Sequence, residues 1–284
     1  MERIAVYGLG LLGGSLCRAV KAKNPRAKIY AYNRNRTSLE KAKVSGAIDE
    51  MLDECRIPDG GVDLAVVAVP VIVSAGIISS LLDSARGSEI VIDLGSVKGG
   101  VVDSVLMHGN AARFVPCHPM AGSERTGFDA SDPMIFNNAS VIITPHEKNS
   151  RSDVEKVAAF WKTLDAHVTL SAPAAHDRIV AFTSHLPHMI ASALAISVRK
   201  SAGETDLLPF IGKGFRDMTR LAEGSADMWT EIGCMNARDI VDALDCCMNE
   251  LQRVRGAISR KGEAKELREF LESGTSARKE IIHE

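Results

Sequence analysis

A glycine-rich turn near the start of the chain has the spacing of a dinucleotide-binding loop. Gly8, Gly10 and Gly13 follow the apolar run Arg3–Tyr7 and open the helical pattern Leu11–Ala22. In such a loop the first glycine permits a tight turn, the second lets the backbone approach a pyrophosphate, and the third lets helix pack on strand. The helix N-terminus adds amide donors for the phosphates. We predict cofactor contacts from six residues of this loop: Gly8, Leu9, Gly10, Leu11, Leu12 and Gly13.

The segment after the second predicted strand, Lys28–Tyr32, bears on the choice between NAD and NADP. NAD sites usually carry an acid about 20 residues after the loop, where it bonds the ribose 2′-hydroxyl. This chain has Asn33 there, followed by Arg34 and Arg36. Without the acid a 2′-phosphate is not repelled, and arginine binds phosphate through charge-assisted contacts. We therefore predict that these three residues favour NADP, with NAD possible; a solvated basic turn is the alternative.

Two further predicted strands end at the edge of the sheet where the glycine loop lies, and open α/β sheets bind ligands at that edge. Val69 and Pro70 close one strand, and the segment DLGSVK follows the other with Ser96 and Lys98. We expect cofactor contacts from Val69, Pro70 and Ser96. Lys98 should point into the same cleft. The Ser96 hydroxyl can also cap a helix, which is compatible with this role.

A histidine follows the next predicted strand, in the segment HPMAGSE. Its position places His118 at the same cleft. Histidine has an ordinary pKa of about 6.5, so its neutral ring can take a proton at neutral pH. A histidine beside a proline in a loop is more often structural, but Ser123 and Glu124 add polar groups close to this one. We predict that His118 is a catalytic base.

The second half of the chain contains a histidine-rich segment, SHLPH, on a predicted helix. Ser184 and His188 lie four residues apart and share a helical face. Pro187 should disturb the helix and free backbone groups. Together with His176–Asp177 upstream, these histidines raise the question of a metal site. His185 and His188 are three apart and lack an H-E-x-x-H pattern, so we predict no metal.

A pair of arginines follows in the segment GFRDMTRL. Arg216 and Arg220 are four residues apart, which puts them on one helical face. The planar guanidinium suits bidentate recognition of carboxylates. The alternative is a solvated helix face with an arginine–aspartate pair.

These candidates need a sheet and helices to position them. Apolar runs alternate with helical patterns in the first half, as βαβ units do. We expect strands at Arg3–Tyr7, Lys28–Tyr32, Leu64–Val69, Glu89–Leu94, Phe114–Cys117, Val141–Thr144 and Val168–Leu170. Beyond about residue 175 only long helical patterns occur, at Asp177–Ser201, Leu207–Glu223, Asp227–Ala257 and Ala264–Ile281. The fold class is α/β: a Rossmann-type, doubly wound, mostly parallel sheet over residues 1–172 and an all-helical domain over residues 173–284.

The composition of the 284 residues is that of an ordinary globular protein. With 45% hydrophobic residues, 25% charged residues and a formal net charge of −2, nucleic acid and an anionic membrane are not expected as partners. No signal-peptide pattern begins the sequence, and no apolar run approaches the ~20 residues that span a bilayer. The six cysteines form no C-x-x-C pair, so we expect reduced thiols in a cytoplasmic protein.

The motifs together resemble the prephenate/arogenate (cyclohexadienyl) dehydrogenase family of tyrosine biosynthesis. The glycine loop, DLGSVK, HPMAGSE, SHLPH, GFRDMTRL and DMWTEI occur in that family's order and span nearly the whole chain. The glycine loop alone is unspecific, whereas HPMAGSE together with SHLPH and GFRD-x-TR is highly specific. The resemblance implies a Rossmann domain, a helical domain that forms a homodimer, and prephenate or arogenate as the substrate.

The same resemblance implies roles for individual residues. His118 matches the catalytic histidine, and Ser96 matches the serine that contacts it and the substrate hydroxyl. His188 and Arg220 match positions that bind substrate carboxylates. Asn33 is the main departure from NAD-using members. The predicted substrate-binding set comprises Ser123, Glu124, Ser184, His188, Arg216 and Arg220.

The implied reaction is oxidative decarboxylation of prephenate to 4-hydroxyphenylpyruvate, with a hydride passing to the nicotinamide. Arg220 favours prephenate, because arogenate carries a cationic amine in its side chain. An arogenate dehydrogenase that yields tyrosine directly is the first alternative. A β-hydroxyacid-type dehydrogenase, with Lys213 as its acid/base, is less similar. A non-catalytic NADP-binding sensor would have no reason to keep His118, Ser96 and Arg220 together.

Overall fold

The computed structural model of this chain describes residues 1–123, 125–260 and 264–283. It contains two compact units, Met1–Ala237 and Arg238–Glu284. Every strand that the structure describes belongs to the first unit, and the second is helical.

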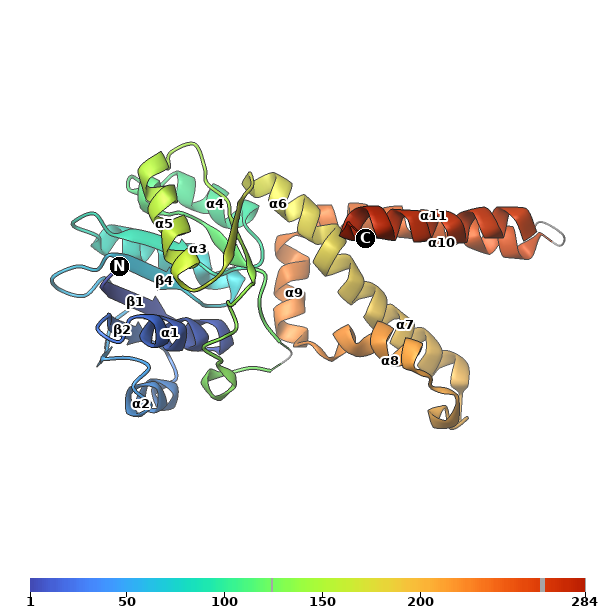
Figure 1. Ribbon diagram of the computed structural model, residues 1–284, viewed down its shortest axis with the longest axis horizontal. Coiled ribbons are helices and arrows are strands. Elements are labelled where there is room, and N and C mark those ends of the chain that lie inside the picture. The colour runs from blue at the N-terminus through green and yellow to red at the C-terminus, as the bar shows by residue number, and fades with distance from the viewer. Residues whose placement is uncertain (124, 261–263, 284) are drawn as a thin grey trace. The chain divides into compact units, whose positions relative to one another are not determined.

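A five-stranded parallel sheet forms the centre of the first unit, with helices on both sides of it (Figure 1). The order is β3-β2-β1-β4-β5, so the chain leaves β1 in one direction and returns to its other side at β4. This topology confirms the predicted doubly wound, Rossmann-type sheet, whose ligands bind where the strand order reverses. The strands are β1 (Arg3–Tyr7), β2 (Lys28–Tyr32), β3 (Glu50–Met51), β4 (Leu64–Val67) and β5 (Ile90–Asp93).

Three further strands continue the architecture: β6 (Cys117–Pro119), β7 (Ser140–Ile143) and β8 (His167–Leu170). β6 is antiparallel to β7, and β7 is parallel to β8, which agrees with a mostly parallel arrangement. A parallel bridge between Val91 and Phe114 joins β5 to the segment just before β6. The start of HPMAGSE is therefore held beside the carboxyl end of β5.

Alternate residues of the strands belong to different packing layers. Ile4 and Val6 of β1 share a buried cluster with Leu16 and Trp161, which come from α1 (Leu11–Lys23) and α5 (Arg151–Thr163). Their neighbours in β1 are also fully buried but lie outside that cluster. Since side chains alternate across a strand, both faces of the sheet are covered.

The other helices of the sheet region are α2 (Arg36–Val44), α3 (Val71–Ser84) and α4 (Gly99–Leu106). Helix α3 packs on β4, β5 and α4. Helix α4 was not predicted from the sequence, because it is short and begins with two glycines, which favour helix weakly. Strand β3 was not predicted either, because it has only two residues and lies at the edge of the sheet, where it pairs with β2.

Helix α6 (Pro173–Val180) leads through a π-helical turn, Ala181–His185, into α7 (Leu186–Ala202). The turn ends two residues before Pro187, in agreement with the predicted disturbance of the helix, and such turns are frequent at functional sites. By length and composition alone this continuous helix could cross a membrane, so the expectation that no run is long enough was wrong. Between Arg178 and Arg199 the helix carries no charged side chain. The core helices of water-soluble proteins pass the same test.

Two predicted helices are interrupted in the structure. The first begins with a 3-10 turn, Leu208–Phe210, and Gly212 is the N-cap of α8 (Lys213–Thr219), which runs into another 3-10 turn, Arg220–Glu223. Asn236 separates α9 (Ala226–Met235) from α10 (Ala237–Ser259).

The second unit consists of α10, apart from its first residue, and α11 (Ala264–Ile282). The domain boundary predicted after residue 172 stays a prediction; α6 begins at the next residue, Pro173.

Candidate active site

The glycine loop has the backbone geometry that its motif predicts. Gly8 has φ +104°, a conformation that favours glycine, and a Cβ there would collide with the carbonyl of Ala68 at the end of β4. A Cβ at Gly13 would collide with the Gly8 carbonyl. At Gly10, by contrast, a Cβ would meet nothing within 4 Å. Gly8 and Gly13 thus permit the close contacts of the turn, whereas the side of the loop at Gly10 is open.

The open side of the loop fits the pyrophosphate of a dinucleotide. Gly10 is the N-cap of α1 and supplies no side chain to the first amides, and the first turn carries no acid. Those N–H groups and the positive end of the helix dipole are available to an anion. Val69 lies against Gly8, and Pro70 caps α3 beside it. We infer that these residues, with Leu9, Leu11 and Leu12, can hold NAD or NADP.

Asn33 is engaged in holding the loop itself. Its Oδ1 accepts from the Leu9 N–H at 3.1 Å, and its Nδ2 donates to the Asn35 carbonyl at 3.1 Å. Arg34 and Arg36 are both exposed. Arg36 lies 3.6 Å from Asp53 and 3.8 Å from Glu40, whereas Arg34 has no ion pair within the described ranges.

The structure corrects the predicted role of Lys98. Its side chain is fully buried, and its Nζ pairs with Asp93 and donates to the Cys117 carbonyl at 2.8 Å. The other Asp93 oxygen accepts from the Cys117 N–H at 3.2 Å. Lys98 therefore joins β5 to β6 and does not point into a ligand cleft.

The suggestion that Ser96 caps a helix was also wrong. Helix α4 starts at Gly99, and the amides of Lys98 and Gly99 donate to the carboxylate of Asp177, at 2.8 and 2.7 Å. A carboxylate from α6 thus satisfies donors that the local sequence leaves open. The half-buried Ser96 has no hydrogen bond to His118 among the described contacts.

His118 is a buried side chain on β6, with 8% of its surface exposed. Its Nδ1 lies 2.8 Å from Nε2 of His176, and the two rings meet edge to face. Burial lowers the pKa of His118 well below its usual value, and the nearby Lys98, His176 and His185 lower it further. His118 is therefore neutral near pH 7.

His176 continues the chain of contacts to a carboxylate. Its Nδ1 lies 2.7 Å from Oδ1 of Asp177, and its side chain is fully buried. Asn236 donates to the Asp177 carbonyl at 2.9 Å and lies 3.3 Å from Nδ1 of His185. The start of α6 is thus fixed to α4 and to the end of α9.

The SHLPH segment lies beside Trp229 of α9. The ring of His188 stacks on this indole at 3.7 Å, and His185 meets it edge to face at 5.9 Å. Burial lowers the pKa of His188, and it lowers that of His185 to about 4. Nε2 of His185 is buried without a hydrogen-bond partner in the described part of the chain. The half-buried Ser184 lies in the π-helical turn between these histidines and α6.

Three other predicted substrate-binding residues are exposed: Ser123, Arg216 and Arg220. The N–H of Arg220 donates to the Arg216 carbonyl, which places the two arginines one turn apart. The 3-10 turn that starts at Arg220 packs on α7, the helix of His188. Ser123 is exposed, and its Oγ accepts from the Arg125 N–H at 3.3 Å. Glu124 lies outside the described residues.

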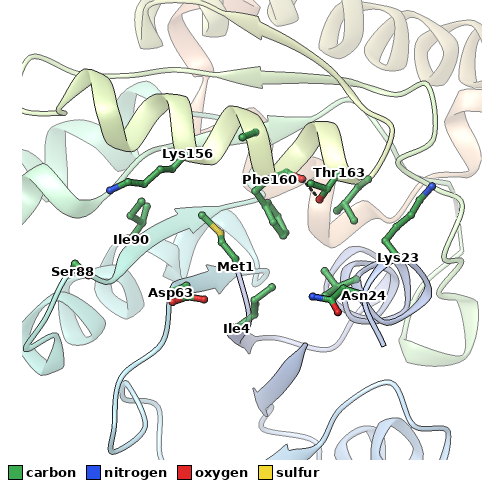
Figure 2. Close-up of a pocket in the computed structure, with 13 residues that line it drawn as sticks. Met1, Ile4, Lys23, Asn24, Asp63, Ser88, Ile90, Lys156, Phe160 and Thr163 are labelled. Carbon is green, nitrogen blue, oxygen red and sulfur yellow. Dashed lines mark hydrogen bonds between the residues drawn. The ribbon is translucent and has the colours of Figure 1, made fainter. Parts of the chain in front are cut away.

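The structure also contains a groove of about 760 Å³ that is remote from these residues (Figure 2). Its lining includes Met1, Asp63 and Ser88, which precede β1, β4 and β5, and Phe160 of α5. This is the amino-terminal edge of the parallel sheet. Since ligands of such sheets bind at the opposite edge, we do not assign the groove to the cofactor. Within residues 1–123, 125–260 and 264–283, no three histidine, cysteine or acidic side chains could hold a metal ion.

Two family models match this chain over most of its length. The model described as "Prephenate dehydrogenase, nucleotide-binding domain" matches residues 16–170, and "Prephenate dehydrogenase, dimerization domain" matches residues 172–273. The chain belongs to the prephenate dehydrogenase family. It is therefore a dinucleotide-dependent oxidoreductase, and the resemblance inferred from the motifs is confirmed.

Individual relatives extend over nearly the same length. Cyclohexadienyl dehydrogenase of Zymomonas mobilis is 30% identical over 274 residues, which cover 96% of this chain and 94% of that protein. Prephenate dehydrogenase of Bacillus subtilis is 32% identical over 257 residues, with 89% and 69% coverage. A crystal structure of prephenate dehydrogenase from A. aeolicus with hydroxyphenyl propionate and NAD+ superposes with a TM-score of 0.90 at 30% identity, covering 99% and 98%.

Four residues at the candidate site were given no role by sequence reasoning. His176 and Asp177 were visible as an adjacent polar pair, but nothing in the sequence placed them beside His118. Trp229 stood inside the family motif DMWTEI, whose function the motif does not state. Asn236 gave no signal, since a lone asparagine in a helical pattern is common.

Proposed function

We propose that this protein catalyses the oxidative decarboxylation of prephenate to 4-hydroxyphenylpyruvate in tyrosine biosynthesis. The observation that carries the proposal is the state of His118. It is buried and neutral on a strand beside the carboxyl end of β5, with Nδ1 held by His176. Its Nε2 is left for a substrate hydroxyl.

The chain's own residues then have separable tasks. His118 accepts the proton of the ring hydroxyl at Nε2, a step that is typically worth about 10²–10⁴ in rate. The nicotinamide, when bound at the glycine loop, would accept the hydride from the carbinol carbon. Aromatisation favours loss of the ring carboxylate, so the protein mainly positions groups.

Substrate binding is assigned to residues of two kinds. The cationic side chains Arg216 and Arg220, with the His188 ring, are proposed to hold the two carboxylates. Ser96 is proposed to contact the hydroxyl, as in the family. The remaining polar residues of the proposed set are Ser123, Glu124 and Ser184.

We further propose NADP as the preferred cofactor. Asn33 places no negative charge at the ribose, and Arg34 has no ion pair of its own within the described residues. NAD remains possible, because the Asn33 amide keeps one lone pair and one N–H beyond its contacts with Leu9 and Asn35, and these can serve a hydroxyl.

A homodimer is proposed through the helical region. The continuous helix of α6 and α7 exposes Ile179, Phe182 and Ile196, and Phe210 beyond it is 79% exposed. This segment lies within the match to the dimerization domain. Since all six cysteines are free thiols, we propose that the dimer works in the cytoplasm.

Side-by-side kinetics with prephenate and arogenate, each with NADP and NAD, test the assignment. We expect prephenate to give the higher kcat/KM. Arogenate is the second candidate, and a higher kcat/KM for it would make the substrate assignment wrong. Absence of turnover with both would overturn the function.

The His118→Asn variant tests the base within the same assays. Turnover should fall by about 10²–10⁴, with cofactor affinity unchanged. In the wild-type enzyme kcat/KM should stay level as the pH falls through 6.5, because burial holds the pKa of His118 well below that value. A variant that keeps more than a tenth of wild-type turnover would remove His118 from the mechanism.

A further inference from the structure

We propose that His176 and Asp177 are positioning residues that form a proton relay with His118. The inference rests on the proposed function, in which Nε2 of His118 is the base. His176 would fix the tautomer of that base and then take the second proton, beside the carboxylate of Asp177.

Hydrogen-bond directions assign the protons. The Asp177 carboxylate accepts backbone N–H bonds from Lys98 and Gly99 and faces Nδ1 of His176 at 2.7 Å. An ionised carboxylate can only accept, so Nδ1 of His176 carries a proton. Nε2 of a neutral His176 is then an acceptor, and Nδ1–H of His118 donates to it across 2.8 Å. Nε2 of His118 is left with its lone pair free.

The surrounding packing holds this arrangement in one orientation. His176 and Asp177 are 1% and 5% exposed. Helix α6, which carries both, packs on α4, and Asn236 binds the Asp177 carbonyl. A ring turned by 180° would lose both of its hydrogen bonds in a buried site, which is costly.

Charge balance supports a role beyond orientation. When Nε2 of His118 takes the substrate proton, a cation forms close to Lys98 and His185, which both disfavour it. The carboxylate of Asp93 is already paired with Lys98. The carboxylate of Asp177 is therefore the one that faces His176 and can stabilise a cation there. If the Nδ1 proton passes to Nε2 of His176, the cation moves next to that carboxylate. One O–H and one N–H bond break, two N–H bonds form, and no other reactant is needed.

Nitrogen-15 NMR of histidine-labelled protein tests the tautomer in the free enzyme. We expect both His118 and His176 to carry their proton on Nδ1, with assignments made from His118→Asn and His176→Gln. A proton on Nε2 of His118 in the wild type would overturn the proposal. This readout needs no substrate, so it stays informative even where the assay with prephenate fails.

Kinetics of two variants separate the two tasks. His176→Leu removes both, and kcat should fall about 100-fold with KM and cofactor affinity unchanged. His176→Gln can accept from His118 and donate to Asp177 but cannot take a proton, so it should recover part of that loss. The control His108→Gln changes a half-buried histidine that lies 2.9 Å from Asp83 and should leave kcat unchanged. Equal losses in the Leu and Gln variants, or a Leu variant within threefold of wild type, would contradict the relay.

Discussion

The histidine cluster and the arginine segments are built in opposite ways. In the cluster, His118, His176 and Asp177 are buried and joined by hydrogen bonds of 2.7 and 2.8 Å. Arg34 and Arg220 are exposed, and neither has an ion pair within the described residues. The groups assigned to proton transfer are therefore in place before any ligand binds. The arginines assigned to anion binding are not held by such contacts.

This difference has a physical reason. A base must be held in one tautomer and close to its working geometry, and burial with satisfied hydrogen bonds achieves this. An anion-binding arginine gains from staying hydrated until the anion arrives, because a buried and unpaired guanidinium is costly. Substitutions in the cluster should thus change stability or kcat, whereas substitutions of the arginines should change affinity alone.

The largest effect is expected from Lys98→Met, which breaks the ion pair that supports the cluster. Removing one partner of a fully buried pair leaves Asp93 uncompensated and should lower the free energy of unfolding by about 3–5 kcal/mol. Urea denaturation measures this. The control Lys156→Met, at an exposed pair with Asp153, should change the free energy of unfolding little. If the free energy of unfolding fell by a similar amount in both variants, burial would not explain the stability that the Lys98–Asp93 pair contributes.

Lys98 also marks the limit of what the sequence could predict. The doubly wound sheet, the glycine loop and the strand before His118 followed from local patterns of apolar residues. The direction of the Lys98 side chain did not, because it depends on Asp93 and Cys117 across two strands. The same holds for Asp177, whose carboxylate caps α4 from 79 residues away. Local patterns carry no information on such pairings.

Arg220→Ala should have an intermediate effect, on substrate affinity. Loss of one charge-assisted contact to a carboxylate predicts a rise in KM for prephenate of about tenfold to a hundredfold, with the melting temperature unchanged. The control Arg151→Ala alters a surface arginine paired with Glu155 on α5 and should leave KM as it is. A fall in kcat at constant KM would place Arg220 with the proton-transfer groups instead and break the contrast.

The smallest effect is expected from Arg34→Ala, and it concerns the choice of cofactor. Asn33 is uncharged and therefore does not repel a 2′-phosphate. Its amide already bonds the Leu9 N–H and the Asn35 carbonyl, so it also attracts the phosphate little. Attraction must then come from the arginines, and Arg36 is shared with Asp53 and Glu40. Arg34→Ala should therefore lower kcat/KM for NADP about tenfold and leave the value for NAD nearly unchanged.

Arg36→Ala is the matched comparison for Arg34→Ala, and it should cost less, because the charge of Arg36 is already shared with Asp53 and Glu40. Measuring kcat/KM for both cofactors in the three proteins separates the contributions. If the wild type had equal kcat/KM for NAD and NADP, neither arginine would recognise the 2′-phosphate. The exposed turn would then be a solvated surface, and of the two arginine segments only the one with Arg220 would remain assigned to anion binding.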